Sequence, residues 1–444
     1  GMITNFGEKF TDVFQKFMPN AFVFALLMTL LTMLVSFLWT DSSPMDILSA
    51  WYKGFWSLLE FGMQIVLMIV TGFSIAISPV LRKGINRLCR VINTPVQVYF
   101  FVAVMGSLLV LVSFGWIVIT CVLARELALR VKGVHYPYLI ALVYFTSGSW
   151  VFGLSSSIPL LLNTKDNYLI EQGVLDETIS TSYSLGSGLN LFMIVLFVIV
   201  AAFLITWLSP KKIQGKELND LLAKDESADE KTIQEEASSL NLPFKNMSDK
   251  LNNSSFLQFT IVGLALTYIV YHFVTYGMDL NFNIMIFIFL VLGMWVHRSP
   301  IRYVIAMKRA SSNISGIIFQ YPFYAGIMGI MIFTGLGENL AALMASVATA
   351  DTYPFFAFAT GGFMNLVIPS AGGEFAVVGP SIISAVQEIG SGLPVEELTK
   401  MVVRASMSVA YGESLSNCLQ PFFLLLVFPV MAAGIKIQAR DIMG

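Results

Sequence analysis

Two acidic residues, Glu374 and Glu413, interrupt stretches that are otherwise apolar or rich in small residues. A carboxylate at the depth of a bilayer is costly, so an acid in such a place is a functional candidate that binds a proton or a cation. We therefore take both as candidates for ion or proton coupling. The alternative is that each acid caps a helix N-terminus. Capping is favoured for Glu374, which follows Gly372 and Gly373, while both interpretations stay open for Glu413.

Small polar residues and glycines accompany these acids in two interrupted stretches, one in each half of the chain. At bilayer depth such residues are tolerated where they line a cavity inside the protein. The free backbone N–H groups and helix dipoles at an interruption favour a negatively charged ligand. Helix packing through small residues is the alternative, and it explains isolated positions better than clusters repeated in both halves. The candidate substrate-binding residues are Ser113, Gly115, Trp116, Ser155, Ser156, Ser157, Ser370, Gly372, Gly373, Ser414, Ser416 and Asn417.

Composition places these residues in a membrane protein. The chain is 56% hydrophobic and 12% charged, whereas soluble domains have roughly a quarter of charged residues. Several apolar runs reach the ~20 residues that a helix needs to cross a bilayer. We therefore predict an all-α polytopic membrane protein. Its expected simple spans are about 20–39, 57–79, 190–208, 256–276, 282–296 and 315–336.

Basic residues near the ends of spans mark the cytoplasmic side of a membrane. Lys9 and Lys16 precede the first span, so we expect a cytoplasmic N-terminus. The stretches 95–132 and 353–389 are too long for one span, and each has loop charges typical of one side at both ends. We expect both to form re-entrant helical hairpins.

Two further spans are predicted to be broken, at about 147–157 and 411–417. The order of span, span, hairpin and broken span then occurs twice, in units of about 20–163 and 282–435 that start from opposite faces. Paired interruptions in two such units are typical of an inverted-repeat transporter whose binding site lies where the units meet.

The repeats imply a division into three parts. The stretch 209–255 carries mixed charges, which indicates a solvated, partly helical linker, with a regulatory role as the alternative. Because the span 190–208 follows the first unit and no equivalent follows the second, we expect a final helix to be missing. The expected parts are a first membrane half, 1–208, a cytoplasmic linker, 209–255, and a second membrane half, 256–444.

Other classes of function find little support in the sequence. The histidines His135, His272 and His297 lie near span ends without metal-ligand spacing, and we find no catalytic motif. With a net charge of −2 and no basic stripe outside the loops, no nucleic-acid partner is expected. We therefore expect no enzyme activity, no metal site and no cofactor.

Several motifs together resemble the bacterial short-chain fatty acid (acetoacetate/butyrate) transporter family, a branch of the ion transporter superfamily. The resemblance runs essentially from end to end of the chain. The motifs that carry it include Gly54-Phe55-Trp56, Phe61-Gly62-Met63-Gln64, Thr94-Pro95-Val96-Gln97, Gln320-Tyr321-Pro322-Phe323-Tyr324-Ala325-Gly326, Ala410-Tyr411-Gly412-Glu413, Gln420-Pro421-Phe422 and Arg440-Asp441-Ile442-Met443-Gly444.

The resemblance implies uptake of a short-chain monocarboxylate across the bacterial inner membrane, coupled to a gradient of H⁺ or Na⁺. It also implies a homodimer that works by elevator-type alternating access. The chain departs from the family at positions of the pocket, among them Ser113, Glu374 and Ser416. An uncoupled channel or facilitator for small carboxylates, and a dicarboxylate transporter of the same superfamily, therefore stay as alternatives.

Overall fold

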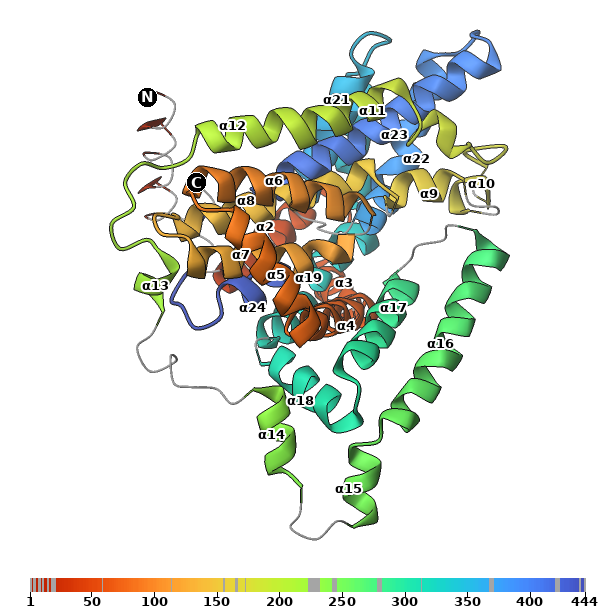
Figure 1. The fold of residues 1–444 in the computed structure, drawn as a ribbon. Coiled ribbons are helices and arrows are strands. Elements are labelled where there is room, and N and C mark those ends of the chain that lie inside the picture. Colours follow the sequence, from red (N-terminus) through yellow and green to blue (C-terminus); the bar gives the residue numbers. More distant parts are fainter. Residues whose placement is uncertain are drawn as a thin grey trace.

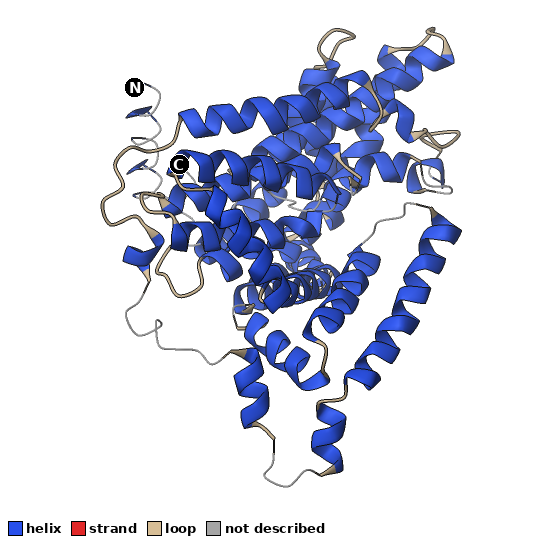
Figure 2. Cartoon of the chain, in the orientation of Figure 1, coloured by secondary structure: helices blue, strands red, loops and turns tan. Residues whose placement is uncertain are grey.

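The computed structural model of the protein is helical throughout the part of the chain that it describes (Figure 2). The described residues are 2, 5–6, 9, 12–13, 16, 21–57, 59–112, 114–154, 156–163, 167–171, 173–222, 232–241, 246–277, 282–312, 314–366, 371–419, 424–438 and 441–442. Within these ranges β structure is limited to an isolated bridge between Leu222 and Ile435. The prediction of an all-α membrane protein is confirmed.

The first half contains long apolar helices and shorter helices that join them. Its main elements are α2 (Ala21–Trp39), α3 (Pro44–Phe55), α4 (Leu59–Ala76), α5 (Pro79–Val91), α6 (Pro95–Val112), the 3₁₀ turn η1 (Phe114–Trp116), α7 (Ile117–Arg130), α8 (Tyr136–Thr146), the 3₁₀ segment η2 (Ser147–Phe152), α9 (Ser157–Leu162), α11 (Gly188–Val195), the π-helical η4 (Leu196–Val200) and α12 (Ala201–Trp207).

The second half also contains both long apolar helices and shorter helices. Its elements are α16 (Ser255–Tyr276), α17 (Phe282–His297), α18 (Pro300–Ala310), α19 (Ser315–Phe333), α20 (Leu336–Ser346), α21 (Tyr353–Asn365), α22 (Ala371–Ile389), α23 (Val395–Asn417) and α24 (Leu424–Met431). Between the halves lie the short helices α13 (Leu218–Leu221), α14 (Ile233–Ser239) and α15 (Met247–Asn252).

Helical segments long and apolar enough to cross a membrane occur in both halves. Over the described residues they are Pro95–Val112, Tyr136–Leu162, Gly188–Trp207 and Met247–Tyr276. The most apolar part of Tyr136–Leu162 is 82% buried inside the protein, whereas that of Gly188–Trp207 is 17% buried. The interrupted span therefore belongs to the protein interior, and the uninterrupted one presents most of its surface to lipid.

Helices of one half pack against helices of the other (Figure 1). Helix α4 contacts α17 and α18, and α19 contacts α2 and α3. Each half also has a helical hairpin: α6 and α7 are joined by η1, and α21 packs on α22. The first hairpin contacts α8 and η2, while the second contacts α23. In both halves a helical hairpin therefore packs against the helix that follows it in the chain. The re-entry of the hairpins and the inverted orientation of the halves stay predictions.

The hydrophilic stretch between the halves contacts both of them. The Lys216 carbonyl accepts from the Tyr136 backbone N–H at 2.9 Å, which attaches the start of this stretch to α8. At α14, Glu236 forms an ion pair with Arg309 of α18 at 2.7 Å. Ile233 packs beside this pair in a small apolar cluster.

The predicted break at 411–417 is wrong. Helix α23 is continuous from Val395 to Asn417 and turns only at the next residues. The small residues serve close packing and hydrogen bonding instead: Gly412 lies against α21, and the Ser414 hydroxyl donates to another helix. A second difference is α3, which lies between the expected spans 20–39 and 57–79, where no helix was predicted. There the Asp46 side chain and Ser43 form a capping box that begins the helix.

Candidate functional site

Helices α21 and α23 cross where glycines leave room for the backbones. A Cβ atom at Gly361 would collide with the backbone of Val409, and one at Gly412 would collide with the carbonyl group of Phe358. Small residues allow helices in membranes to approach this closely. As a result, the end of α21 lies directly against the last turns of α23.

Asn365, the last residue of α21, fills this contact with a fully buried amide. Its Nδ2 group lies 3.2 Å from the Glu413 carbonyl oxygen and 2.9 Å from the Ser416 hydroxyl oxygen. It also donates to Oδ1 of Asn417. Ser416 and Asn417, both predicted substrate-binding residues, are thus held together by a residue from the hairpin.

Glu374 and Glu413 belong to α22 and α23, which pack on one another, and their carboxyl groups have no partners among the described residues. Glu374 is 0% exposed in the first turn of α22, and Glu413 is 1% exposed in α23. Neither carboxyl group has a hydrogen-bond partner among the described residues. An ionised carboxylate buried in this way costs several kcal/mol unless a positive charge accompanies it. The pair can therefore hold a proton or a cation.

The hydrogen bonding of the two acids also decides between a coupling role and a role in capping a helix N-terminus. An acid that caps a helix accepts hydrogen bonds from backbone N–H groups of the first turn. In the described part of the chain Glu374 accepts none, although it lies in the first turn of α22. Glu413 lies near the end of a helix, where the free backbone groups are carbonyls. We therefore favour the coupling role for both acids.

The first half contacts α23 directly at this level. The Ser414 hydroxyl donates to the Gly148 carbonyl oxygen at 2.8 Å. The Tyr411 hydroxyl donates to Oδ1 of the buried Asn190 at 3.1 Å, and the Tyr411 ring lies 5.5 Å from the ring of Phe152. The interrupted segment η2 and the end of α23 thus form one junction between the halves.

The first half has its own close crossing, between α6 and the interrupted segment. A Cβ atom at Gly153 would collide with the carbonyl group of Leu111, and the next backbone N–H, of Leu154, donates to that same oxygen at 2.9 Å. Nearby, the Ser149 hydroxyl donates to the Ser107 carbonyl oxygen at 2.9 Å. Serines of this crossing are therefore satisfied by backbone carbonyls.

The remaining candidates from the first half are spread over two places. Ser156 is 1% exposed and precedes α9, whose first residue, Ser157, has a buried hydroxyl without a partner in the described ranges. Trp116 ends η1, which also contains Gly115, and its ring lies 6.3 Å from that of Phe289 in α17. The tryptophan therefore packs in an apolar cluster with α17.

Other candidates cannot be placed. Ser113, Ser155 and Ser370 lie outside the described residues. Gly372 and Gly373 belong to the first turn of α22, which also carries Glu374. The structure thus brings together the candidates Ser416 and Asn417 of α23 through Asn365, while Ser414 of the same helix contacts Gly148, which was not a candidate.

Comparisons with known proteins agree on one family. The model of the family described as "Short chain fatty acid transporter" matches residues 2–444. A Haemophilus influenzae protein is 33% identical over all of this chain and 96% of its own length, and an Escherichia coli protein is 32% identical over all of this chain and 95% of its own. Both carry the provisional name of a short-chain fatty acid transporter.

The chain belongs to the short chain fatty acid transporter family. It is a membrane transporter and not an enzyme. The solved structure of Neisseria gonorrhoeae MtrF, described as one of a class of antimetabolite efflux pumps, is 15% identical over 97% of this chain and 92% of that chain. Its TM-score of 0.41 is too low to inform the fold of this family member.

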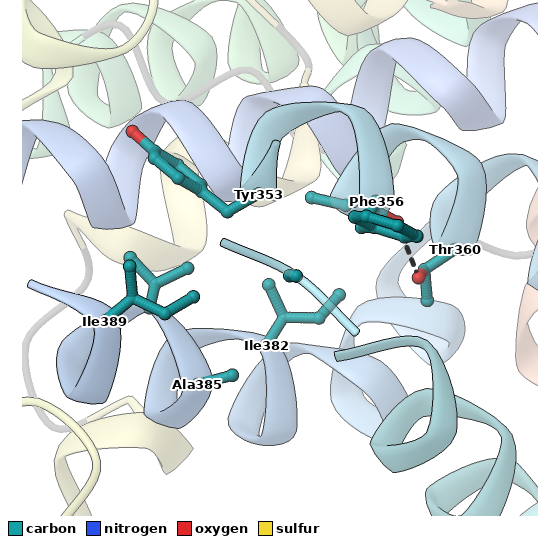
Figure 3. Close-up of a pocket in the computed structure, with 9 residues that line it drawn as sticks. Tyr353, Phe356, Thr360, Ile382, Ala385 and Ile389 are labelled. Carbon is teal, nitrogen blue, oxygen red and sulfur yellow. Dashed lines mark hydrogen bonds between the residues drawn. The ribbon is translucent and has the colours of Figure 1, made fainter. Parts of the chain in front are cut away.

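A separate pocket of this transporter lies between α21 and α22, the legs of the second hairpin (Figure 3). Its residues from α22 begin at Ile382, about two turns after Glu374. Its volume of about 10 Å³ suffices for roughly one water molecule. The lining is mostly apolar, and Thr360 donates to its own helix at the Phe356 carbonyl oxygen, 2.7 Å away. The pocket is too small for a carboxylate substrate. Its residues are Ala348, Tyr353, Phe356, Ala357, Thr360, Ile382, Ala385, Val386 and Ile389.

Sequence reasoning missed two asparagines of the junction. Asn365 and Asn190 are both 0% exposed, and each connects separate helices through its amide. A polar amide at the end of an apolar helix was the available signal, because such a group needs partners inside the bilayer. Its partners lie far away in the sequence, so the connection itself was not visible.

Proposed function

We propose that this protein is a secondary active transporter of short-chain fatty acids or related small monocarboxylates across the bacterial inner membrane. Uptake is coupled to a gradient of H⁺ or Na⁺ through Glu374 and Glu413. The family supports the substrate class. The observation that carries the coupling is the pair of buried acids in α22 and α23, which have no hydrogen-bond partners within the described ranges.

The chemistry of the junction fits such coupling. An anionic substrate and a buried acid repel each other unless a cation or a proton is bound as well, so binding of the two ligands is mutually dependent. Ser414, Ser416 and Asn417 supply short polar groups for the substrate. The Glu374 and Glu413 carboxyl groups supply acceptors for the cation.

An elevator-type motion of a homodimer completes the proposal. The hairpins, the interrupted segment and α23 contact one another and form the moving part. Helices α2, α3, α4, α17, α18 and α19 form the support. Support for a partner copy comes from α16, whose outward side chains include Leu264, Val274 and Phe256 at 66%, 80% and 84% exposure. Lipid covers the rest of this apolar surface.

Coupled transport is tested by uptake of labelled butyrate into proteoliposomes with an imposed proton or sodium gradient. We expect accumulation above the equilibrium level with one of these gradients and only equilibration without it. Equilibration under every gradient would identify an uncoupled channel or facilitator and overturn the proposed coupling.

The substrate class is tested by thermal unfolding of the purified protein with carboxylates of two to eight carbons, with and without sodium. A ligand that binds only the folded state raises the unfolding temperature by mass action. We expect the largest rise with short monocarboxylates. A rise confined to dicarboxylates would place the protein with the dicarboxylate transporters.

A further inference from the structure

The amide of Asn365 faces more acceptors than it has hydrogen atoms. Its NH₂ group carries two hydrogens. The acceptors within reach are the Glu413 carbonyl oxygen, the Ser416 hydroxyl oxygen and Asn417 Oδ1. The Ser416 hydroxyl competes as well, since it lies 3.3 Å from the Glu413 carbonyl oxygen as a donor. When the Ser416 hydroxyl donates to the Glu413 carbonyl oxygen, the two amide hydrogens can serve Ser416 and Asn417. When that hydroxyl turns to another acceptor, the amide must serve the Glu413 carbonyl oxygen itself, so the set has more than one arrangement.

The other end of the same amide has no donor among the described residues. The orientation of the amide follows from the Glu413 backbone carbonyl, which can only accept and so requires the NH₂ group on its side. Asn365 Oδ1 is buried without a hydrogen-bond partner in the described ranges. A buried acceptor of this kind carries a full desolvation penalty until a donor or a cation reaches it.

The unpaired oxygens of the junction therefore belong to three residues. Asn365 Oδ1 and the carboxyl oxygens of Glu374 and Glu413 are all buried acceptors without donors among the described residues. They come from α21, α22 and α23, which pack on one another. A proton or a cation is the ligand that such a set lacks.

We propose that Asn365 is the positioning residue that couples cation binding at Glu374 and Glu413 to substrate binding at Ser416 and Asn417. The inference rests on the proposed function and adds the connection between its two sites. A bound proton or cation gives Oδ1 a partner and fixes the amide. The NH₂ group is then committed to one set of acceptors, which presents the Ser416 hydroxyl and the Asn417 amide to the substrate.

Other charged groups do not take this role. The helices in contact with α21, α22 and α23 place their remaining charges at exposed positions: Glu338, Glu388, Glu396, Glu397, Lys400 and Arg404. Arg404, the basic residue nearest in sequence, lies about 13 Å before Glu413 along the axis of α23. The other titratable groups of these helices are Tyr353, which interacts with Arg404, and Tyr411, which donates to Asn190.

The test measures the affinity of the purified full chain for butyrate at low and high pH, and with and without sodium. In the wild type, the cation should change the dissociation constant at least about fivefold, the lower end of typical couplings between sites. Asn365→Leu keeps the branched shape of the side chain and removes the amide. The ratio of its dissociation constants without and with the cation should therefore fall to about one. If Asn365 had only a structural role, its replacement would change the affinity for butyrate or the stability. The ratio of the dissociation constants without and with the cation would then stay at the wild-type value.

Two further variants keep the test decisive. Ser416→Ala removes one competing acceptor and only a hydroxyl group, so it should reduce the ratio even if Asn365→Leu fails to fold. Thr360→Val, on the same helix, removes a hydroxyl that bonds to its own helix and should keep the wild-type ratio. A wild-type ratio retained in both Asn365→Leu and Ser416→Ala overturns the inference alone. A wild type whose affinity ignores both cations overturns the proposed coupling and, with it, this inference.

Discussion

The two close helix crossings of the molecule share a backbone design and differ in their polar groups. In the first half α6 meets the interrupted segment at Gly153, and in the second half α21 meets α23 at Gly361 and Gly412. Both contacts exclude a Cβ atom because a carbonyl group of the other element occupies its place. The geometry that brings helix ends together is therefore common to both halves.

The difference lies in which polar groups find partners. In the first crossing Ser149 bonds to a backbone carbonyl. In the second crossing the carboxyl groups of Glu374 and Glu413 and Oδ1 of Asn365 have no partner within the described part of the chain. The comparison indicates that the glycines serve the close crossings in both halves, whereas the buried acids without partners among the described residues occur in the second half. We propose that these acids bind a ligand.

The largest effect should come from filling the crossings. Gly412→Ala and Gly153→Ala each place a methyl group where a carbonyl group lies, and we expect either to destabilise the protein by about 3 kcal/mol or more. Gly84→Ala is the control, because a Cβ atom at this position of α5 would meet nothing within 4 Å. Thermal unfolding in detergent measures all three. Equal stability of Gly412→Ala and Gly84→Ala would show that the second crossing is not close-packed.

The two hairpins also differ in the side chain that donates hydrogen bonds to backbone carbonyl oxygens of a neighbouring segment. Arg125 of α7 donates to the Met431 and Ala433 carbonyl oxygens at 2.8 and 2.7 Å, at the end of α24, whereas Gln387 of α22 donates to the Val174 carbonyl oxygen at 2.8 Å. Bonds from a charged donor are the stronger ones, so Arg125→Met should cost about 2 kcal/mol and Gln387→Leu about 1 kcal/mol. Thermal unfolding compares the two, and an equal or reversed order would contradict the difference.

A smaller effect is expected at the junction between the crossings. Ser414→Ala removes the hydrogen bond to the Gly148 carbonyl oxygen and should reduce stability by about 1 kcal/mol. The matched control is Ser312→Ala, whose hydroxyl bonds to its own chain at an exposed position. If both variants unfold at the same temperature, the bond between the halves contributes nothing.

A separate effect depends on pH and lies outside the spans. Burial and then the charge of Lys216 lower the pKa of His135, which precedes α8, from 6.5 to about 4. Its neutral ring accepts from the Tyr138 backbone N–H at 3.1 Å. The folded state binds this proton less readily than the unfolded state, so the stabilisation is complete above pH 6.5 and is lost as the pH falls toward about 4.

Replacement of the same histidine provides the check. His135→Asn keeps an acceptor for the helix N-terminus and has no titrating group. We expect the unfolding temperature of this variant to vary less between neutral and mildly acidic pH than that of the wild type. An unchanged pH dependence would assign the effect to other groups.

The long helices could be predicted from the sequence, because each of them depends on local composition. Apolar runs predicted α2, α16 and α17 nearly to their ends, since a bilayer demands a minimum length of apolar helix. The two hairpins followed from charge at both ends of overlong stretches, and their helical legs are present as α6–α7 and α21–α22. Short amphipathic helices such as α3 were missed, because their signals are caps and not hydrophobic length.

The buried acids could be identified from the sequence, for physical reasons, while the contacts around them could not. Buried acids in apolar surroundings are visible in a sequence, and Glu413 was found in this way. The effect of Gly412 was misjudged, because a glycine that breaks a helix and one that admits a neighbour look alike until the neighbour is known. Asn365 was missed because its partners in α23 become adjacent only on folding.

The central claim is that a buried acid of α23 couples a cation to carboxylate uptake. The most direct measurement compares labelled butyrate exchange with gradient-driven accumulation in proteoliposomes that contain the wild type or Glu413→Gln. Exchange needs no net cation movement, so it should persist in the variant, while accumulation should fall at least about tenfold. Accumulation by Glu413→Gln at the wild-type level would contradict the account and leave Glu413 a structural role.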